Sequence, residues 1–373
     1  MRLGYSFHGF LADRKFKNGS EVSTPDGNAA YSWSILHEAQ KRGWTTYLMQ
    51  EDRDLEYTLR VEDSLDCFDS FSARNRYNAW SNTIPYGKSN SFPELDILLL
   101  EWRWPIPGRN CKVSKDDPNY QPDLDRQEEL LRHYYTTHTK VIIWDLDQKL
   151  TWEDENLWAP HAIFETSVTP KLQCIKRTRV EPPIIIDDLL QFPTIPCNPK
   201  RKLAYVGSRY ERDDVIEEWI KPVSDKFPGE VEFWGNWLRE PNLAECKAMW
   251  PDISYNKRIT MRDFREVYST AVACPILAKQ SYLDTGFITP RPWEALMFGT
   301  IPVGLSSHKG IEDYVFSSQI ARDGQDLAEL VEVMASWDFC DRDSVRRANI
   351  EKIRFMDVSN FVNRIEDVLN GRR

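Results

Sequence analysis

The stretch Thr289-Pro-Arg-Pro-Trp-Glu-Ala-Leu-Met-Phe-Gly-Thr-Ile-Pro-Val-Gly304 joins a proline-framed helix start to a glycine-ended helix and a short apolar run. Pro292 suits a first helical turn, where no donor hydrogen is missed, and Glu294 in that turn faces the positive end of the helix dipole. Gly299 can end the helix in the left-handed conformation. Positions 301–304 then read as a short buried strand that ends in a tight turn. The stretch therefore predicts a short helix followed directly by a strand.

The order Arg-x-x-Glu-Ala-x-x-x-Gly-x-x-Pro-Val within this stretch resembles the donor-site segment of GT-B glycosyltransferases. These enzymes move a sugar from a nucleotide diphosphate. The resemblance implies that Glu294 holds the ribose hydroxyls of the donor and that Arg291 meets its diphosphate. The alternative is a helix-turn-strand in which Arg291 and Glu294 pair at i,i+3 on a solvated face.

Composition places the chain among soluble globular proteins. Of its 373 residues, 41% are hydrophobic and 28% are charged. No apolar run approaches the ~20 residues that a membrane span needs. The first residues lack the apolar region and cleavage site of a secretory signal, so we expect a cytoplasmic location and no membrane span.

The cysteines and the net charge exclude further classes. Seven scattered cysteines without a Cys-x-x-Cys pair indicate neither a zinc site nor a disulfide framework. A net charge of −10 argues against nonspecific coating of nucleic acid, although a local basic groove can coexist with it. Asp145-Leu-Asp147 imitates the metal-binding Asp-x-Asp of the other glycosyltransferase fold, but two acids at a strand end are usually cleft or capping residues. No obligatory metal is predicted.

The first half alternates strands with helices. Apolar runs predict strands at 2–7, 45–49, 95–101, 140–145 and 162–165, and helical spacing predicts helices at 29–42 and 123–135. The later strands end in polar residues, as buried parallel strands require. This half predicts a doubly wound domain over 1–185, and the proline-dense stretch 180–199 is the candidate linker.

The second half repeats the alternation. Strands are expected at 202–207, 231–235, 274–277 and 301–304, and helices at 213–226, 261–271, 325–337, 343–355 and 359–369. The fold class is therefore α/β, with two doubly wound, Rossmann-like domains. We place the second domain at 186–355 and a C-terminal helix, which could pack back on the first domain, at 356–373. In the GT-B architecture that the chain resembles, the acceptor occupies the first domain, the donor the second, and the site is the cleft between them.

A second donor segment, Gly207-Ser-Arg-Tyr-Glu-Arg212, follows a predicted strand and precedes a predicted helix. Free backbone amides at such a helix start bind phosphate well, and Arg209 and Arg212 would add charge-assisted bonds. We therefore assign Gly207, Ser208, Arg209 and Arg212 to the donor, and a UDP-sugar is the expected co-substrate. The alternative is an ordinary solvated turn.

An inverting transferase needs a carboxylate or histidine that takes the proton of the acceptor. Glu101, at the end of an apolar strand, is the first candidate, and Asp26 and His8 follow. The alternatives are a surface carboxylate paired with Arg103 and a structural, hydrogen-bonding His8. Many retaining members of the resembled family carry a second glutamate eight positions before the ribose-binding one, which here is Gly286, so inversion is favoured.

The acceptor is the least determined part of the site. Trp102 and Arg103 could stack on a ring and hold an anion, and Arg74 and Arg76 form a basic group in the same half. The chain looks similar to bacteriophage enzymes that attach sugars to hydroxymethylated pyrimidines in DNA, for which a base would have to be flipped out. Duplex DNA with hydroxymethylated bases, glycans, lipid-linked acceptors and small molecules all stay open.

Two other classes compete with a transferase. A noncatalytic module on the same scaffold would recognise DNA or a glycan through the basic, aromatic first half and release no nucleoside diphosphate. A nucleotide-sugar epimerase of similar design is disfavoured, because the opening loop lacks a clear Gly-x-Gly-x-x-Gly fingerprint.

Overall fold

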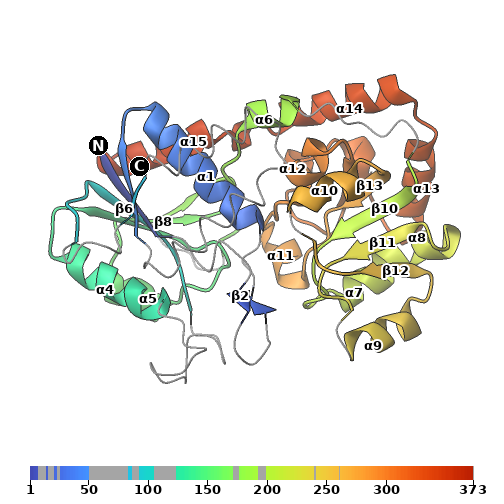
Figure 1. Cartoon of the computed structure of the whole chain (residues 1–373), viewed down its shortest axis with the longest axis horizontal. Coiled ribbons are helices and arrows are strands. Elements are labelled where there is room, and N and C mark those ends of the chain that lie inside the picture. Colours follow the sequence, from blue (N-terminus) through green and yellow to red (C-terminus); the bar gives the residue numbers. More distant parts are fainter. Residues whose placement is uncertain are drawn as a thin grey trace. The chain divides into compact units, whose positions relative to one another are not determined.

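The computed structural model of the protein describes residues 1–6, 14–15, 21–22, 26–49, 83–85, 92–104, 123–170, 176–191, 199–238, 241–259 and 261–372. These residues form two compact units (Figure 1). Unit 1 comprises Met1–Thr166, Pro170–Ile184 and Met356–Arg373, and unit 2 comprises Ser167–Thr169 and Ile185–Phe355. Both ends of the chain therefore belong to unit 1.

Unit 1 is built on a parallel sheet with the strand order β5-β4-β1-β6-β7-β8-β9. Its strands are β1 (Arg2–Ser6), β4 (Thr45–Leu48), β5 (Ile84–Pro85), β6 (Ile97–Glu101), β7 (Lys140–Trp144), β8 (Ala162–Glu165) and β9 (Arg177–Arg179). A separate antiparallel pair joins β2 (Arg14–Lys15) to β3 (Glu21–Val22). The central strand β6 is buried along its whole length, which explains why it reads as a continuous apolar run.

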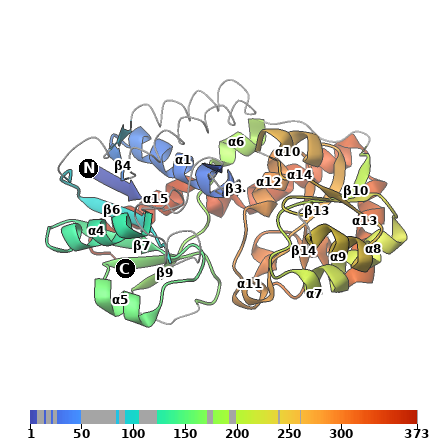
Figure 2. The same ribbon diagram turned by 60° about the horizontal axis from the view of Figure 1, so that its bottom comes forward.

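Helices cover both faces of this sheet. On one face, α4 (Asp123–Tyr135) packs beside β7 and shares a core with Leu98 and Leu100 of β6 (Figure 2). On the other face, α1 (Asp26–Lys41) packs against α15 (Val358–Leu369), whose Phe361 ring lies 4.8 Å from that of Trp144. The last helix of the chain thus completes the core of unit 1. A short helix, α5 (Trp152–Trp158), follows β7.

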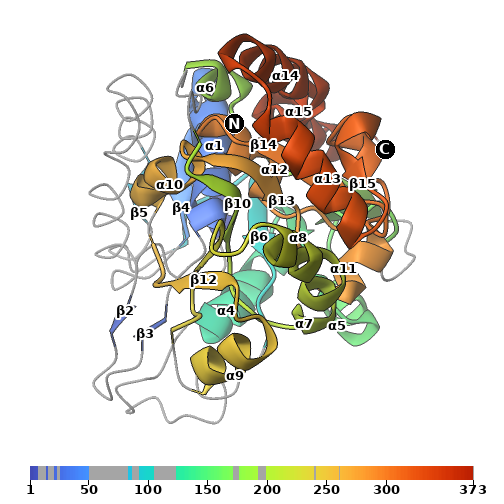
Figure 3. The ribbon, with the colours of Figure 1, turned by 90° about the vertical axis from the view of Figure 1, so that its right-hand side faces the viewer.

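Unit 2 repeats the plan with the parallel order β12-β11-β10-β13-β14-β15. The strands are β10 (Arg201–Val206), β11 (Val231–Trp234), β12 (Ile253–Asn256), β13 (Ala271–Pro275), β14 (Ile301–Leu305) and β15 (Ile320–Ala321). After β10 the chain forms α7 (Asp213–Val215), a π-helical turn (Ile216–Ile220) and α8 (Lys221–Lys226). Helix α8 packs against α13 (Gly324–Ala335) (Figure 3).

The remaining helices of unit 2 are α6 (Ile186–Gln191), α9 (Asn242–Met249), α10 (Met261–Tyr268), α11 (Gln280–Thr285), α12 (Arg291–Met297) and α14 (Phe339–Lys352). Helix α10 packs on β10 and β13, and α12 packs on β13 and β14. Gly299 follows the end of α12 with a φ of 92°, the left-handed stop expected from the sequence. Among the described residues, no helix is long and apolar enough to cross a membrane.

The predicted α/β class with two doubly wound units is confirmed. The prediction of a linker over 180–199 is wrong in part. Helix α6 falls inside that stretch and packs on α12 and α14, where Arg346 donates to the carbonyl of Leu189. The proline-dense stretch is therefore not a linker throughout, because it contains a helix that packs within unit 2.

Candidate functional site

Each sheet reverses its strand order beside its first strand. In unit 2 the chain runs from β10 outward to β11 and β12 and then returns to β13 on the other side of β10. In unit 1 it runs from β1 to β4 and β5 and returns to β6. Ligands of open α/β sheets bind outside the carboxyl ends of the strands at such reversals. Each unit therefore offers one position for a site.

In unit 2 this position is shaped by Gly207, which directly follows β10. Its N–H donates to Trp234 O at 2.8 Å, and its carbonyl accepts from Trp237 Nε1 at 2.7 Å. A Cβ added at Gly207 would lie 2.3 Å from the hydroxyl oxygen of Tyr205. Because no side chain fits over Tyr205, the backbone at this strand end must be glycine.

A cavity of about 960 Å³ opens beside this loop. It is lined by residues of the β10–α7 loop, of the start of α11 and of two nearby turns. These residues are Ser208, Arg209, Tyr210, Glu211, Asp213, Asp214, Asn236, Asn242, Lys279, Gln280 and Ser281. Two of the predicted donor residues, Ser208 and Arg209, thus line a cavity at the strand-order reversal.

Both predicted arginines of this loop make contacts within unit 2. The guanidinium of Arg209 donates to both carboxylate oxygens of Asp213, at 2.8 and 2.6 Å, and to Glu245 at 2.5 Å. The hydrogen bond to Asp213 and, to a smaller extent, the one to Glu245 raise the pKa of Arg209 above its ordinary value. Arg212 donates to the carbonyls of Ser208 and Tyr210 and does not line the cavity. These contacts favour roles in holding the loop.

Lys279 is a cavity residue that the sequence analysis missed. It is buried, and its ammonium lies 3.3 Å from the carboxylate of Glu211. The ammonium also lies 4.5 Å from the ring centroid of Tyr282 and 5.5 Å from that of Tyr210. Its position just after the apolar run 271–278 would have marked it as a strand-end residue. Glu211 itself has a φ of 49°, an uncommon backbone for a non-glycine residue.

The opening stretch places Arg291 and Glu294 in the first turn of α12, and their side chains form an ion pair. Burial raises the pKa of Glu294, and the nearby guanidinium of Arg291 opposes that rise. The predicted alternative of a solvated pair is wrong, because Glu294 is 1% exposed. Arg291 lies 6.0 Å from the ring centroid of Tyr205, the residue that supports Gly207. Neither residue lines the cavity described above.

The position of the retaining glutamate cannot accept a side chain. Gly286 has a φ of 68°, and a Cβ there would lie 2.5 Å from the carbonyl oxygen of Lys309 and 2.8 Å from Val168. Val168 reaches this spot from the segment between β8 and β9, and its N–H donates to Gly286 O at 3.4 Å. A carboxylate at this position is therefore excluded by backbone and packing together.

In unit 1 the reversal brings Glu101 next to the end of β1. Glu101 is fully buried, and its carboxylate accepts a hydrogen bond from the hydroxyl of Tyr5. Burial and the adjacent Glu101 raise the pKa of Tyr5 well above its ordinary value. Arg103, also fully buried, donates to the backbone carbonyl of Glu101 at 3.1 Å and to the Ser6 hydroxyl at 3.0 Å. The alternative of a surface carboxylate at Glu101 is therefore wrong.

The position of Trp102 does not fit its predicted stacking role. It is 5% exposed and packs in the core of unit 1 with Met49, Leu95 and Leu130. The backbone N–H of Trp102 donates to Trp144 O, so the pairing of β6 with β7 continues one residue past the end of β6. His8, Arg74 and Arg76 lie outside the described residues, and so does the side chain of Asp26, whose backbone begins α1. Their assignments stay predictions.

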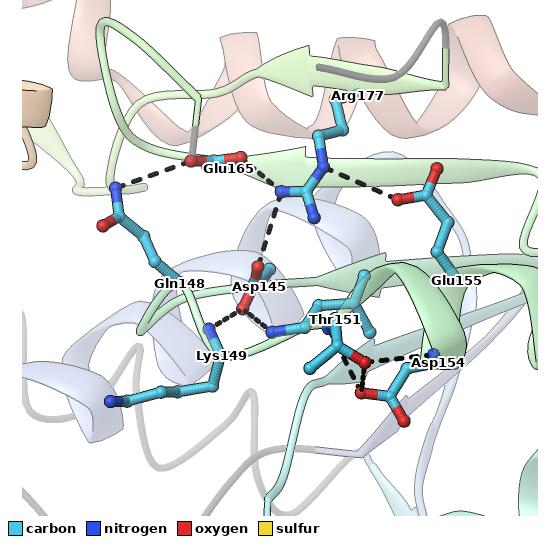
Figure 4. Close-up of polar contacts among 9 residues, drawn as sticks. Asp145, Gln148, Lys149, Thr151, Asp154, Glu155, Glu165 and Arg177 are labelled. Carbon is cyan, nitrogen blue, oxygen red and sulfur yellow. Dashed lines mark hydrogen bonds and ion pairs between the residues drawn. The ribbon is translucent and has the colours of Figure 1, made fainter. Parts of the chain in front are cut away.

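Asp145, the first acid of the Asp-x-Asp sequence, has both carboxylate oxygens engaged by protein groups (Figure 4). Oδ1 accepts from the N–H groups of Lys149 and Leu150, and Oδ2 lies 3.4 Å from Arg177. Asp147, two residues later, is only half-buried. Within the part of the chain that the structure describes, no group of three potential metal ligands occurs.

Comparisons with known proteins give structural but not sequence matches. No family model matches the chain, and no curated protein matches it in sequence. An α-glucosyltransferase, solved with UDP and a 13-mer DNA containing an HMU base, is similar with a TM-score of 0.59 and 14% identity over 99% of each chain. The β-glucosyltransferase of phage T4 gives a TM-score of 0.59 and 12% identity, again over 99% of each chain.

A third similar structure is sucrose-phosphate synthase of Thermosynechococcus elongatus. It has a TM-score of 0.55 and 12% identity, and the match covers 99% of this chain and 98% of that one. At such low identities the likeness establishes the fold and not the chemistry. The described residues of the chain thus have the GT-B fold of these glycosyltransferases.

Proposed function

We propose that the protein is a glycosyltransferase that moves a sugar from a UDP-sugar to a hydroxyl group of a 5-hydroxymethylpyrimidine base in DNA. The observation that carries the proposal is the cavity at the strand-order reversal of unit 2, with Gly207 directly after β10 and Lys279 at the start of α11. The same fold occurs in an α-glucosyltransferase bound to UDP and HMU-containing DNA. We further propose that the protein acts in the cytoplasm, the host cytoplasm if a phage encodes it.

The donor would bind in unit 2. Backbone amides after Gly207 can bind a diphosphate. The ammonium of Lys279 can exchange its ion pair with Glu211 for one with a phosphate oxygen, because both partners are negatively charged. Arg291, which lies close to the Tyr205 ring, would meet the diphosphate, and Glu294 would hold the ribose hydroxyls. Arg209 and Arg212 would hold the loop in shape. No metal is required by this scheme.

The acceptor would bind to unit 1, at the ends of β1, β6 and β7. During transfer the acceptor oxygen forms a bond to the anomeric carbon, the bond to UDP breaks, and a carboxylate takes the hydroxyl proton. Glu101 lies at the reversal but is fully buried against Tyr5. Asp147, half-buried on the turn after the adjacent strand, is more accessible. We therefore propose Asp147 as the base, with Glu101 as the competing candidate.

We also propose an inverting reaction. The similar structures include both an α- and a β-glucosyltransferase, so the fold is compatible with either anomeric outcome. The tightly packed Gly286 leaves no room for a second carboxylate, which favours a single displacement. The anomeric configuration of the product, measured by NMR, would decide the point, since retention would contradict this part of the proposal.

The first experiment is nucleoside diphosphate release from a panel of sugar nucleotides, with and without duplex DNA that contains 5-hydroxymethylcytosine or 5-hydroxymethyluracil. Release that depends on the modified base supports both donor and acceptor. Release without DNA would keep the transferase and redirect the acceptor search to glycans and small molecules. Binding of modified DNA without any release would favour a noncatalytic module.

Point variants then separate the two halves of the site. Lys279→Ala and Glu294→Ala should weaken UDP binding at least tenfold by calorimetry, and wild-type affinity in both would contradict the donor site. Asp147→Asn should abolish transfer while UDP binding persists. If Glu101→Gln abolishes transfer and Asp147→Asn does not, the base is Glu101. Lys247→Ala, in α9, serves as a control for loss of a lysine that does not line the cavity.

A further inference from the structure

Three buried carboxylates surround one guanidinium at the carboxyl ends of β7 and β8 (Figure 4). Arg177, the first residue of β9, is 3% exposed at its side chain. It donates to Glu165 at 2.5 Å and lies 3.4 Å from Asp145 and 3.7 Å from Glu155. Three carboxylates thus contact one guanidinium in the interior of unit 1.

This cluster fixes the turn between β7 and α5. Asp145 Oδ1 accepts from the N–H groups of Lys149 and Leu150, at 2.7 and 3.1 Å. Gln148, whose φ of 55° is uncommon for a non-glycine residue, directs its amide toward Glu165, with 3.5 Å between Nε2 and Oε1. Asp145 therefore binds the far end of the turn and Glu165 lies beside its middle, and Arg177 contacts both carboxylates.

The turn stands beside the proposed acceptor site. Glu101, the last residue of β6, is the register partner of Trp144, the last residue of β7, and Asp145 follows directly. Asp147 lies in the middle of the turn, between Asp145 and the left-handed Gln148. Any movement of Asp145 would therefore move Asp147 relative to the edge of the sheet.

Stability does not account for this arrangement. Removing charges from water costs more than a buried pair usually regains, and here three buried carboxylates lie within 4 Å of one guanidinium. Burial, with a smaller contribution from Glu165, raises the pKa of Asp145 to about 6, although its backbone hydrogen bonds and Arg177 oppose the rise. Because burial disfavours the ionised form of Asp145, its place in this cluster indicates a role other than stability.

We propose that Asp145 and Arg177 are positioning residues for sugar transfer, which fix the turn from Asp145 to Leu150 and with it Asp147 at the acceptor edge. This inference rests on the proposed transferase function. Ionised Asp145 accepts from Arg177 and holds the turn, whereas the protonated acid loses much of that attraction. Asp145 faces Glu165 from β8, Arg177 from β9 and, through Arg177, Glu155 from α5. Activity should therefore rise as pH increases through 6.

The test is Asp145→Asn in the full chain, assayed for transfer to hydroxymethylated DNA and for UDP binding. We expect kcat to fall at least tenfold at pH 7.5, the KM for the donor and the affinity for UDP to stay within twofold, and the rise of kcat through pH 6 to disappear. Since the amide removes a costly charge, the variant should melt at the same temperature as the wild type or higher. Loss of activity without loss of stability is the expected signature.

Asp154→Asn is the matched control. Asp154 belongs to the capping box that starts α5, accepts from Thr151 and does not contact Arg177. This variant should melt at a lower temperature and keep the wild-type kcat and pH profile. Arg177→Lys, which keeps the charge, should retain more activity than Arg177→Met, which leaves the three carboxylates without their cation.

The outcomes separate the two levels of the proposal. A wild-type protein that transfers no sugar overturns the proposed function. A wild-type protein that transfers, together with an Asp145→Asn variant of unchanged kcat and pH profile, overturns only the positioning role. A variant whose activity and melting temperature fall together, as with a purely structural residue, overturns it as well.

Discussion

Acidification is expected to destabilise unit 2 through His308. This residue follows β14 and is 2% exposed, and its Nε2 lies 3.1 Å from the carbonyl oxygen of Phe287, to which it donates. Burial lowers the pKa of His308 from 6.5 to about 4, although the bond to Phe287 opposes this. In the folded protein the ring is therefore neutral at pH 5, whereas in the unfolded chain it is mostly protonated.

The sign and the size of the effect follow from this difference in pKa. Because the folded value is the lower one, the stabilisation is fully present above pH 6.5 and is lost as pH falls toward 4. At about 1.4 kcal/mol for each unit of pKa, the loss is about 2 kcal/mol by pH 5 and about 3 kcal/mol by pH 4. Asp145 has the opposite effect on the free energy of unfolding over this pH range. Its folded pKa is raised, so protonation as pH falls stabilises the folded protein.

The wild type alone would therefore hide the effect, and the assay compares it with His308→Gln. Glutamine can still donate to Phe287 O but does not titrate. The free energy of unfolding of both proteins is measured by urea denaturation from pH 7.5 to 4.5, and contributions shared by the two, including that of Asp145, cancel in the difference. The wild-type advantage should shrink by about 2 kcal/mol between pH 7 and pH 5. A difference that stays constant with pH would refute the assignment of a buried, neutral His308.

Three further substitutions test other parts of the structure. Gly207→Ala should weaken UDP binding at least tenfold, because the new methyl group collides with the Tyr205 hydroxyl and shifts the loop; calorimetry measures this, and unchanged affinity would contradict the glycine requirement. Gly286→Ala should cost about 2 kcal/mol or more in urea denaturation, since it adds left-handed strain to a clash with Val168; a neutral effect would reopen this position to a carboxylate. Arg42→Ala should lower protection of α15 from proteolysis, because Arg42 donates to the Ser359 carbonyl at 3.0 Å and lies 3.2 Å from Glu366; equal cleavage rates would show that apolar packing alone holds the helix.

Periodicity in the sequence predicted the fold well because buried parallel strands are continuous apolar runs. The helix at 123–135 and the strand at 162–165 have the predicted limits, and Gly299 adopts the predicted left-handed backbone. The antiparallel pair β2–β3 and the short strands β5, β9 and β15 were missed, since two or three residues are too few to show an alternation of apolar and polar side chains. Helix α6 was missed because nearby prolines concealed its apolar spacing.

The candidate site was less predictable, because residue type does not reveal which partner a side chain finds. Arg209 reads as a phosphate ligand, but Asp213, four residues later at the start of α7, forms a bidentate pair with it. Trp102 reads as a stacking residue, yet strand pairing continues through it and carries its ring into the core. Lys279 belongs to no motif, and apart from its position after the apolar run 271–278 its importance depends on strand β10, which lies far away in the sequence.

The docking of α15 on α1 has a consequence for biosynthesis. The strands of unit 1 leave the ribosome first, but the helix that covers one face of their sheet is made last, after all of unit 2. Until residues 358–369 emerge, the apolar faces of α1 and of Trp144 lack their partner Phe361. The second unit made can therefore fold before the first is complete, and the nascent N-terminal half exposes this apolar surface until then.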